Sequence, residues 1–359
     1  MNWRREGCAS LILALALLQA APIRCMANAE PQEGTVKVAV SIGSLSLLVA
    51  AAGGSHVLTV ELVPQGMDPH EFLITPEAVM SASQASLVVV TGHIGWEDKL
   101  LEEVAERRGR TVGEVGLSLL KDLRGSLILL ELPSGRGGGG GVNLHGFWLH
   151  PDNAKVIVEA VASKLSLIDP ENAGDYLRNS MAFSNRVELL KNMLRGVSEA
   201  HGLSGKRIVA GSPAEQYVAA ALYLETAVVL GGEEGEARPT ALSEAYEGLA
   251  EGRYAMILVS DVAAMLPIYA SFEELSSETG APIATVRILS FESFPDYFAL
   301  MAYNAGRISG IRPANPRGGS ANGGILWPVI ASTAGVLALV EALIIWRGRL
   351  WSTRWRRRS

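Results

Sequence analysis

The sequence predicts an α/β protein with two Rossmann-like lobes, each built on a parallel sheet, joined by a long rigid backbone helix. Short apolar runs alternate with helical runs in both halves of the chain, and two long helical stretches lie between these halves. The length of 359 residues also favours two domains, at one domain per ~150 residues. A hydrophobic content of 48% with a net charge of only −6 excludes intrinsic disorder as the overall class.

Residues 1–29 predict a secretory signal peptide. A basic start is followed by an apolar run over 8–23 and by the small-residue pattern A-x-A at 27–29. The alternative is an uncleaved membrane anchor, but Pro22 and Arg24 interrupt the run and argue against a full span. The mature chain is therefore expected to begin near residue 30.

Residues 325–346 predict a transmembrane helix, because a span needs ~20 mostly apolar residues. The tail 347–359 contains six arginines, which marks it as cytoplasmic. Glu341 lies inside the span, close enough to the tail to reach the interface. Residues 313–324 are rich in Gly, Asn and Pro and predict a flexible tether. We expect a single-pass protein of the cell membrane with residues 30–312 outside.

The predicted outer part of the chain is acidic. Residues 1–29 carry a charge of +2 and residues 313–359 carry +6, which leaves −14 for residues 30–312. This charge is compatible with attraction of cations and makes nucleic acid an improbable partner. The only cysteines, Cys8 and Cys25, lie in the predicted leader, which excludes a disulfide scaffold and a thiol nucleophile in the mature protein.

The first lobe is predicted over residues 30–150. Its expected strands are 36–41, 57–63, 87–91 and 127–132, and its expected helices are 44–52, 76–83 and 98–108. Thr75 and Pro76 predict the start of the second of these helices, as N-cap and first helical residue. Because the strands are continuously apolar, we expect a parallel sheet covered by helices on both faces.

The second half begins with the linking helices, predicted over residues 151–203. Residues 153–168 and 171–201 are both helical in pattern, and the longer stretch would span ~45 Å at 1.5 Å per residue.

The second lobe is predicted over 204–312. Its expected strands are 207–210, 226–230, 256–260 and 283–289, and its expected helices are 214–223, 242–251, 271–279 and 294–308. Ligands of such sheets bind at the carboxyl ends of strands, which favours a cleft between the lobes as the site.

A glycine run occupies residues 137–141, just before the histidine-rich segment 143–154. Five consecutive glycines cannot support regular structure at low cost. The run is interpreted either as a mobile lip over the cleft or as an inert surface loop.

Signature motifs of common enzymes are missing from the sequence. It contains no G-x-x-x-x-G-K-[ST] phosphate loop and no G-x-S-x-G nucleophile elbow. We therefore expect a protein that is not an enzyme.

Histidine is scarce, and two of the six histidines stand out by context. His70 lies in the loop LVPQGMDPHEF after the second predicted strand, and His145 lies in NLHGFWLHPDNA. Imidazoles beside strand ends are candidate metal ligands, although a lone histidine is more often solvated or structural. We interpret His56, His93 and His201 as solvated or structural histidines and assign a helix-entry role to His150.

These segments carry a resemblance to a known family. The early run VKVAVSIGSLSLLVAAAGG, the D-P-H loop, SASQASLVVVTG, the FWLHPDNA helix entry and the late helix 297–308 occur in matching order. The chain resembles the solute-binding proteins of zinc and manganese ABC importers, the ZnuA/TroA-like cluster A-I family. The resemblance implies two lobes on a rigid helix, a transported divalent metal ion (Zn or Mn), and an ABC transporter permease as partner.

The resemblance also implies four metal ligands. The histidine of the D-P-H loop corresponds to His70. The second ligand position falls on Gly146, and a one-residue insertion would bring His145 there. The other two positions fall on Ser212 and Ser290, with Glu215 one turn after the first and Glu292 two residues after the second.

The implied set is therefore His70, His145, Glu215 and Glu292, and two imidazoles with two carboxylates would suit Zn²⁺ or Mn²⁺. Asp261 is a further carboxylate expected to face the cleft. The predicted function is a membrane-anchored receptor that captures a divalent cation for an ABC importer. Alternatives are the same fold binding a non-metal ligand, an adhesion module, and a metal-dependent enzyme.

Overall fold

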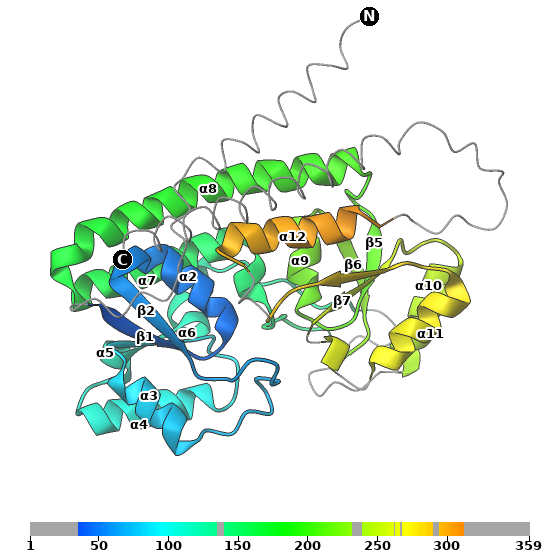
Figure 1. Cartoon of the computed structure of the whole chain (residues 1–359). Coiled ribbons are helices and arrows are strands. Elements are labelled where there is room, and N and C mark those ends of the chain that lie inside the picture. Colours follow the sequence, from blue (N-terminus) through cyan, green and yellow to red (C-terminus); the bar gives the residue numbers. More distant parts are fainter. Residues whose placement is uncertain are drawn as a thin grey trace, which may run out of the picture. The chain divides into compact units, whose positions relative to one another are not determined.

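The computed structural model describes residues 35–134, 140–231, 239–261, 263–265, 268–289 and 294–311. These residues belong to one compact unit that holds two parallel β-sheets (Figure 1). The predicted leader, tether, transmembrane helix and tail lie outside the described residues. Within the described ranges, we find no helix with the length and apolarity needed to cross a membrane.

The first sheet has the strand order β2-β1-β3-β4, with all neighbours parallel. Its strands are β1 (Val36–Val40), β2 (Val57–Glu61), β3 (Leu87–Val90) and β4 (Gly116–Ser118). The α-helices of the first lobe are α2 (Gly43–Gly53), α3 (Pro76–Gln84), α4 (Glu97–Arg108), α5 (Val112–Val115) and α6 (Leu119–Leu123). Its 3-10 helices are η1 (Gly54–His56) and η2 (Arg124–Ser126). As predicted, Thr75 caps α3 by accepting a hydrogen bond from Ala78 N, with Pro76 in the first turn.

One strand prediction was wrong. Residues 127–132 belong to neither sheet, and Glu131 makes only an isolated antiparallel bridge to Val142. The backbone of this segment is instead paired with side chains, since Ile128 N donates to Asn153 Oδ1 and Leu130 N donates to the Tyr217 hydroxyl. The edge position is taken by the three-residue strand β4, which is too short to produce a hydrophobic pattern.

Two long helices follow the first lobe, as predicted. η3 (Phe147–Leu149) leads into α7 (Pro151–Ile168), and η4 (Pro170–Asn172) leads into α8 (Ala173–Ala200). α8 has 28 residues and packs along α7 and α2 (Figure 1). Its buried residues Phe183, Val187 and Leu190 recur at helical spacing and form the face that contacts the rest of the protein.

The second sheet repeats the topology of the first, with the order β6-β5-β7-β8 and parallel neighbours. Its strands are β5 (Arg207–Ala210), β6 (Glu225–Val229), β7 (Ile257–Ser260) and β8 (Ile283–Val286). Its helical elements are α9 (Glu215–Ala221), α10 (Pro239–Ala250), η5 (Ala263–Met265), α11 (Tyr269–Thr279) and α12 (Tyr297–Ser309). Two four-stranded parallel sheets therefore confirm the predicted two-lobed α/β class.

The two lobes share one hydrophobic core. A single cluster of buried residues runs from Val38 of β1 through Ile157 of α7 and Leu194 of α8 to Leu258 of β7. Smaller clusters cover the opposite face of each sheet, around Val88 in the first lobe and around Val259, in β7, in the second. Because every central strand is covered on both faces, its residues are apolar on both sides, which explains the continuous apolar runs in the sequence.

Candidate metal site

Three histidine side chains converge in the structure. His70, His93 and His145 each offer a ring nitrogen, and these three atoms lie within 4.8 Å of one another. The ring centroids of His70 and His93 are 5.5 Å apart, those of His70 and His145 are 5.2 Å apart, and those of His93 and His145 are 4.8 Å apart. Imidazole nitrogen is a common ligand of transition metals, so this histidine triad can hold a metal ion.

His70 lies in the loop that follows β2. Its backbone N–H donates to Asp68 Oδ1 over 2.9 Å, which closes the turn of the D-P-H motif. The preceding Pro69 carbonyl accepts a hydrogen bond of 2.8 Å from Trp96 Nε1, at the start of α4. The loop is therefore anchored directly before His70, while the His70 residue itself is exposed.

His93 lies in the short loop between β3 and α4. The carboxylate of Glu97, which is fully buried, accepts hydrogen bonds from the backbone N–H groups of three loop residues, at 2.8, 2.6 and 3.3 Å, and from one hydroxyl at 2.7 Å. The donors are Thr91 N, Gly92 N, Ile94 N and Thr91 Oγ1. Gly92 has a φ of +87°, and a Cβ there would lie 2.6 Å from Ser118 Oγ, so the turn requires glycine. These constraints fix the backbone that carries His93.

The His93 ring is held as a neutral imidazole. It stacks on Trp148 at a centroid distance of 5.9 Å, and its Nδ1 is buried without a hydrogen-bond partner among the described residues. Burial, with smaller contributions from His145 and His70, lowers the pKa of His93 from 6.5 to about 2. An unprotonated imidazole is the form that binds a metal ion.

We expect His93 to make the metal-free protein less stable in acid. The unfolded chain takes up a proton at His93 below pH 6.5, whereas the folded state does so only near pH 2. The free energy of unfolding should fall by up to roughly 1.4 kcal/mol per pH unit as the pH drops below 6.5. Urea unfolding of the chelator-treated protein between pH 5 and 7 measures this slope. His93→Phe should show a shallower slope, and an equal slope in the variant would contradict the assignment.

His145 lies in the loop before η3. Its backbone N–H donates to Asn143 Oδ1 over 2.9 Å. The next residue, Gly146, has a φ of +79°, and a Cβ there would lie 3.0 Å from the backbone of Ala214 in the second lobe. The close approach of the two lobes therefore requires glycine directly after His145. Gly146 is also the position on which the family resemblance places a ligand.

Glu215 does not join the histidine triad. Its carboxylate is fully buried at the start of α9 and accepts hydrogen bonds of 2.7 Å from Ser212 N and 2.7 Å from Ser260 N. The Ser212 hydroxyl donates a further short hydrogen bond. Burial raises the pKa of Glu215. Both carboxylate oxygens are thus engaged inside the second lobe, where they join the end of β5 to the end of β7.

The other implied ligand, Glu292, lies outside the described residues, as does Ser290. Asp261 is almost fully buried, and its carboxylate accepts hydrogen bonds from Ile288 N at 2.8 Å and Leu289 N at 3.3 Å. It therefore orders the chain after β8.

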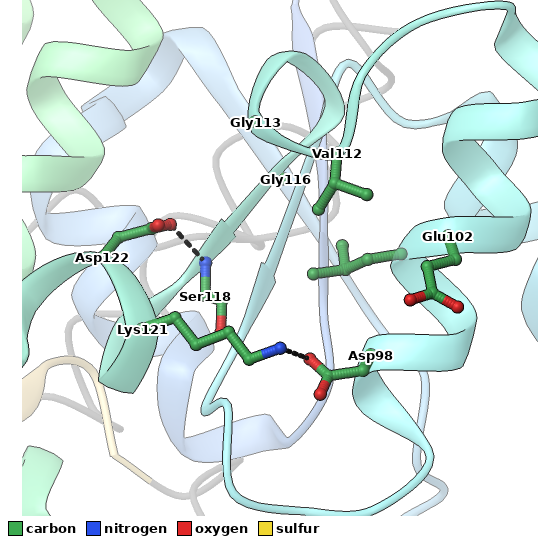
Figure 2. Close-up of a pocket in the computed structure, with 9 residues that line it drawn as sticks. Asp98, Glu102, Val112, Gly113, Gly116, Ser118, Lys121 and Asp122 are labelled. Carbon is green, nitrogen blue, oxygen red and sulfur yellow. Dashed lines mark hydrogen bonds and ion pairs between the residues drawn. The ribbon is translucent and has the colours of Figure 1, made fainter.

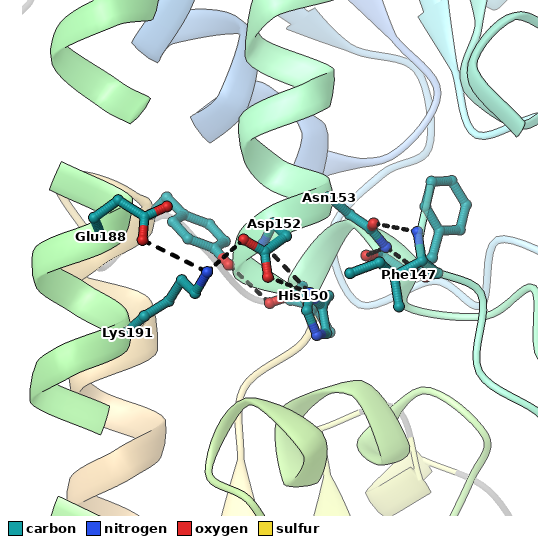
Figure 3. A network of polar contacts seen from close by, with 9 residues as sticks. Phe147, His150, Asp152, Asn153, Glu188 and Lys191 are labelled. Atoms are coloured by element: carbon teal, nitrogen blue, oxygen red, sulfur yellow. Dashed lines mark hydrogen bonds and ion pairs between the residues drawn. The ribbon is translucent and has the colours of Figure 1, made fainter. Parts of the chain in front are cut away.

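His150 has the helix-entry role predicted for it. It is the N-cap of α7, and its Nδ1 accepts a hydrogen bond of 3.3 Å from Asp152 N. Asp152 in turn pairs with Lys191 of α8 over 2.7 Å (Figure 3). Asn153, labelled in the same view, donates to the Phe147 carbonyl over 2.8 Å and joins η3 to α7.

A separate pocket lies beside the edge strand β4 (Figure 2). It is lined by Asp98, Leu101, Glu102, Val112, Gly113, Gly116, Ser118, Lys121 and Asp122. Lys121 Nζ pairs with Asp98 over 2.7 Å within it. None of the three clustered histidines lines this pocket, so it is distinct from the candidate metal site.

Sequence reasoning missed His93. The signal that could have found it is its position, three residues after the last residue of β3. β2 and β3 flank β1 and run parallel to it, so the loops after them leave the same edge of the sheet. Two histidines in these two loops are therefore close in space even though they are far apart in sequence.

Known proteins resemble this chain over most of its length. The family model described as "ZnuA: Zinc-uptake complex component A periplasmic" matches residues 38–310. The metal ABC transporter substrate-binding lipoprotein SloC of Streptococcus mutans is 24% identical over 268 residues, which cover 71% of this chain and 83% of SloC. The manganese ABC transporter substrate-binding lipoprotein PsaA of Streptococcus pneumoniae is 23% identical, covering 76% of this chain and 88% of PsaA.

Three further comparisons add one sequence relative and two solved structures. The iron ABC transporter substrate-binding lipoprotein MtsA of Streptococcus pyogenes is 24% identical over 76% of this chain and 88% of MtsA. A crystal structure of ZnuA superposes with a TM-score of 0.62 at 21% identity, covering 77% of this chain and 98% of that one. The Mn-bound periplasmic metal binding protein of Candidatus Liberibacter asiaticus gives a TM-score of 0.62 at 16% identity, with coverages of 77% and 99%. With the family model matching well over half of its length, this chain belongs to the ZnuA family of substrate-binding proteins.

Proposed function

We propose that this protein captures a divalent metal ion and presents it to an ABC importer in the membrane. The observation that carries the proposal is the convergence of three imidazoles whose ring nitrogens lie within 4.8 Å of one another. Family membership supports the transport role, since the matching relatives are named as substrate-binding lipoproteins of metal ABC transporters. The protein is thus a receptor, and the metal ion is its cargo.

His70, His93 and His145 are the proposed ligands. Three neutral nitrogen donors suit Zn²⁺, which binds imidazole at about 2.0–2.1 Å, whereas Mn²⁺ favours carboxylate and carbonyl oxygens. The relatives are named for manganese, iron or metals in general, and the family is named for zinc. We therefore base the expected order of metal affinities on the donor atoms of this chain. We therefore propose Zn²⁺ as the preferred cargo.

The membrane attachment belongs to the same proposal. In this proposal, residues 325–346 anchor the protein in the cell membrane with the basic tail inside. Residues 30–312 face outward after removal of the leader. Tethering by residues 313–324 would keep the receptor at high effective concentration beside its permease. The acidic outer part would favour the approach of cations.

Metal titration tests the function. The full chain in detergent, stripped with a chelator, should bind one equivalent of Zn²⁺ with sub-micromolar affinity and Mn²⁺ at least about tenfold more weakly, because the described donors are all nitrogen. Isothermal calorimetry measures both affinities. The matched control is His201→Ala, since His201 is an exposed histidine at the end of α8. Absence of binding of either ion at micromolar concentration would refute a metal receptor and leave a non-metal ligand or an adhesion role.

A further inference from the structure

We propose that Asn143 is a positioning residue through which the second lobe controls metal affinity without supplying a ligand at this contact. This inference rests on the proposed function. Asn143 lies in the first lobe and precedes His145 by two residues. It contacts the second lobe directly, so it joins one metal ligand to a lobe that carries none of the three histidines.

The Asn143 side chain uses both of its polar atoms. Its Oδ1 accepts the hydrogen bond from His145 N over 2.9 Å. Its Nδ2 donates 2.8 Å hydrogen bonds to the Pro213 carbonyl and to Gln216 Oε1, both in the second lobe. The Asn143 side chain is fully buried, so its polar atoms are costly to leave without partners.

Tyr217 and Gln216 of the second lobe bind both Asn143 and the neighbouring residues Leu130 and Glu131. The Tyr217 hydroxyl donates to the Asn143 carbonyl over 2.6 Å and accepts a hydrogen bond of 3.1 Å from Leu130 N. Gln216 Nε2 donates to the Glu131 carbonyl over 2.8 Å. Both side chains come from α9, whose first residue is Glu215. The buried Glu215 carboxylate thus holds the helix start, and α9 holds the loop that carries His145.

The three histidines differ in what fixes their loops. His70 and His93 are held by first-lobe groups, Asp68 and Glu97 respectively. His145 is held through Asn143 against Pro213 and against Gln216 of α9. A tetrahedral zinc ion would draw its nitrogen ligands to about 3.4 Å from one another. How readily His145 meets this requirement therefore depends on how the second lobe places its loop.

Two substitutions on opposite sides of this contact test the proposal. Tyr217→Phe, in the second lobe, and Asn143→Asp, in the first, should each raise the zinc dissociation constant about tenfold or more, in the range seen when supporting partners of metal ligands are removed. Chelator competition on the full chain measures the constant. Cobalt(II) at saturation should give the wild-type visible spectrum in both variants, because the three ligands are still present.

Asn153→Asp is the matched control. Asn153 is as buried as Asn143 and also makes three hydrogen bonds, to Ile128 N, Ile128 O and Phe147 O, but it does not contact the His145 backbone. The Asn153→Asp substitution should lower the melting temperature of the metal-free protein while leaving the zinc dissociation constant within about twofold of wild type.

The outcomes separate the two proposals. Wild-type zinc affinity in both Tyr217→Phe and Asn143→Asp would overturn the positioning role and leave the proposed function intact. An equal loss of affinity in Asn153→Asp would also overturn it, because general destabilisation would then explain the effect. If the wild-type protein binds no metal, the proposed function fails first and this inference fails with it.

Discussion

Replacement of His93 by alanine should lower the zinc affinity by about 100-fold or more, or about 2.7 kcal/mol, since the loss of a supporting partner alone costs 10–100-fold. The physical reason is that His93 supplies one of three ring nitrogens within 4.8 Å of one another. Its ring centroid lies 5.5 Å from that of His70 and 4.8 Å from that of His145, so removal of the ring takes away one side of the triad. Chelator competition on the full chain measures the change.

His93→Phe separates the ligand from its packing. Phenylalanine keeps an aromatic ring against Trp148, where His93 stacks at 5.9 Å, but has no nitrogen to offer. It should lose zinc affinity as severely as alanine while keeping more of the thermal stability. His201→Ala should bind zinc like wild type. Wild-type affinity in His93→Phe would show that His93 packs beside the site without binding the ion.

Replacement of Glu215 by glutamine should destabilise the protein by about 2–4 kcal/mol, because it breaks a fully buried hydrogen-bonded network. Both carboxylate oxygens accept backbone N–H groups, Ser212 N on one and Ser260 N on the other. The glutamine amide can accept only on its oxygen, so one buried N–H group would face another donor. Urea unfolding of the metal-free protein measures the loss.

The same variant tests whether Glu215 binds the metal. At a temperature where it is folded, Glu215→Gln should still take up one equivalent of Zn²⁺, because the carboxylate faces Ser212 and Ser260. Loss of the zinc equivalent together with unchanged stability would instead make Glu215 a ligand. The comparison with His93→Ala is informative, since that change should affect metal binding more than stability.

The fold was predictable because its signals are local. Continuous apolar runs such as Val36–Val40 arise from strands buried on both faces, and the pattern of α8 arises from one buried helix face. The failures were at the sheet edge, where β4 has only three residues and residues 127–132 are apolar without being a strand. The polar groups that pair this segment, Asn153 and Tyr217, lie 25 and 87 residues away along the chain.

The candidate site was only partly predictable. The D-P-H loop and the segment before FWLHP marked His70 and His145 from the sequence alone. His93 stands in no such motif and became a candidate only when the sheet order brought the loops after β2 and β3 to one edge. Glu215 was a reasonable ligand by its spacing from Ser212, but spacing does not reveal which way a buried carboxylate points.

The sequence by itself determined the two parallel α/β lobes, the long helix between them and two of the three clustered histidines. The lobes and the helix depend on residues close together in the chain, whose periodicity reports burial, and the two histidines stand in local motifs. The tertiary structure alone decided that His93 completes the triad, that Glu215 serves the second lobe, and that Asn143 joins His145 to α9. Each of these depends on contacts between distant segments, which chain folding sets and local pattern does not encode.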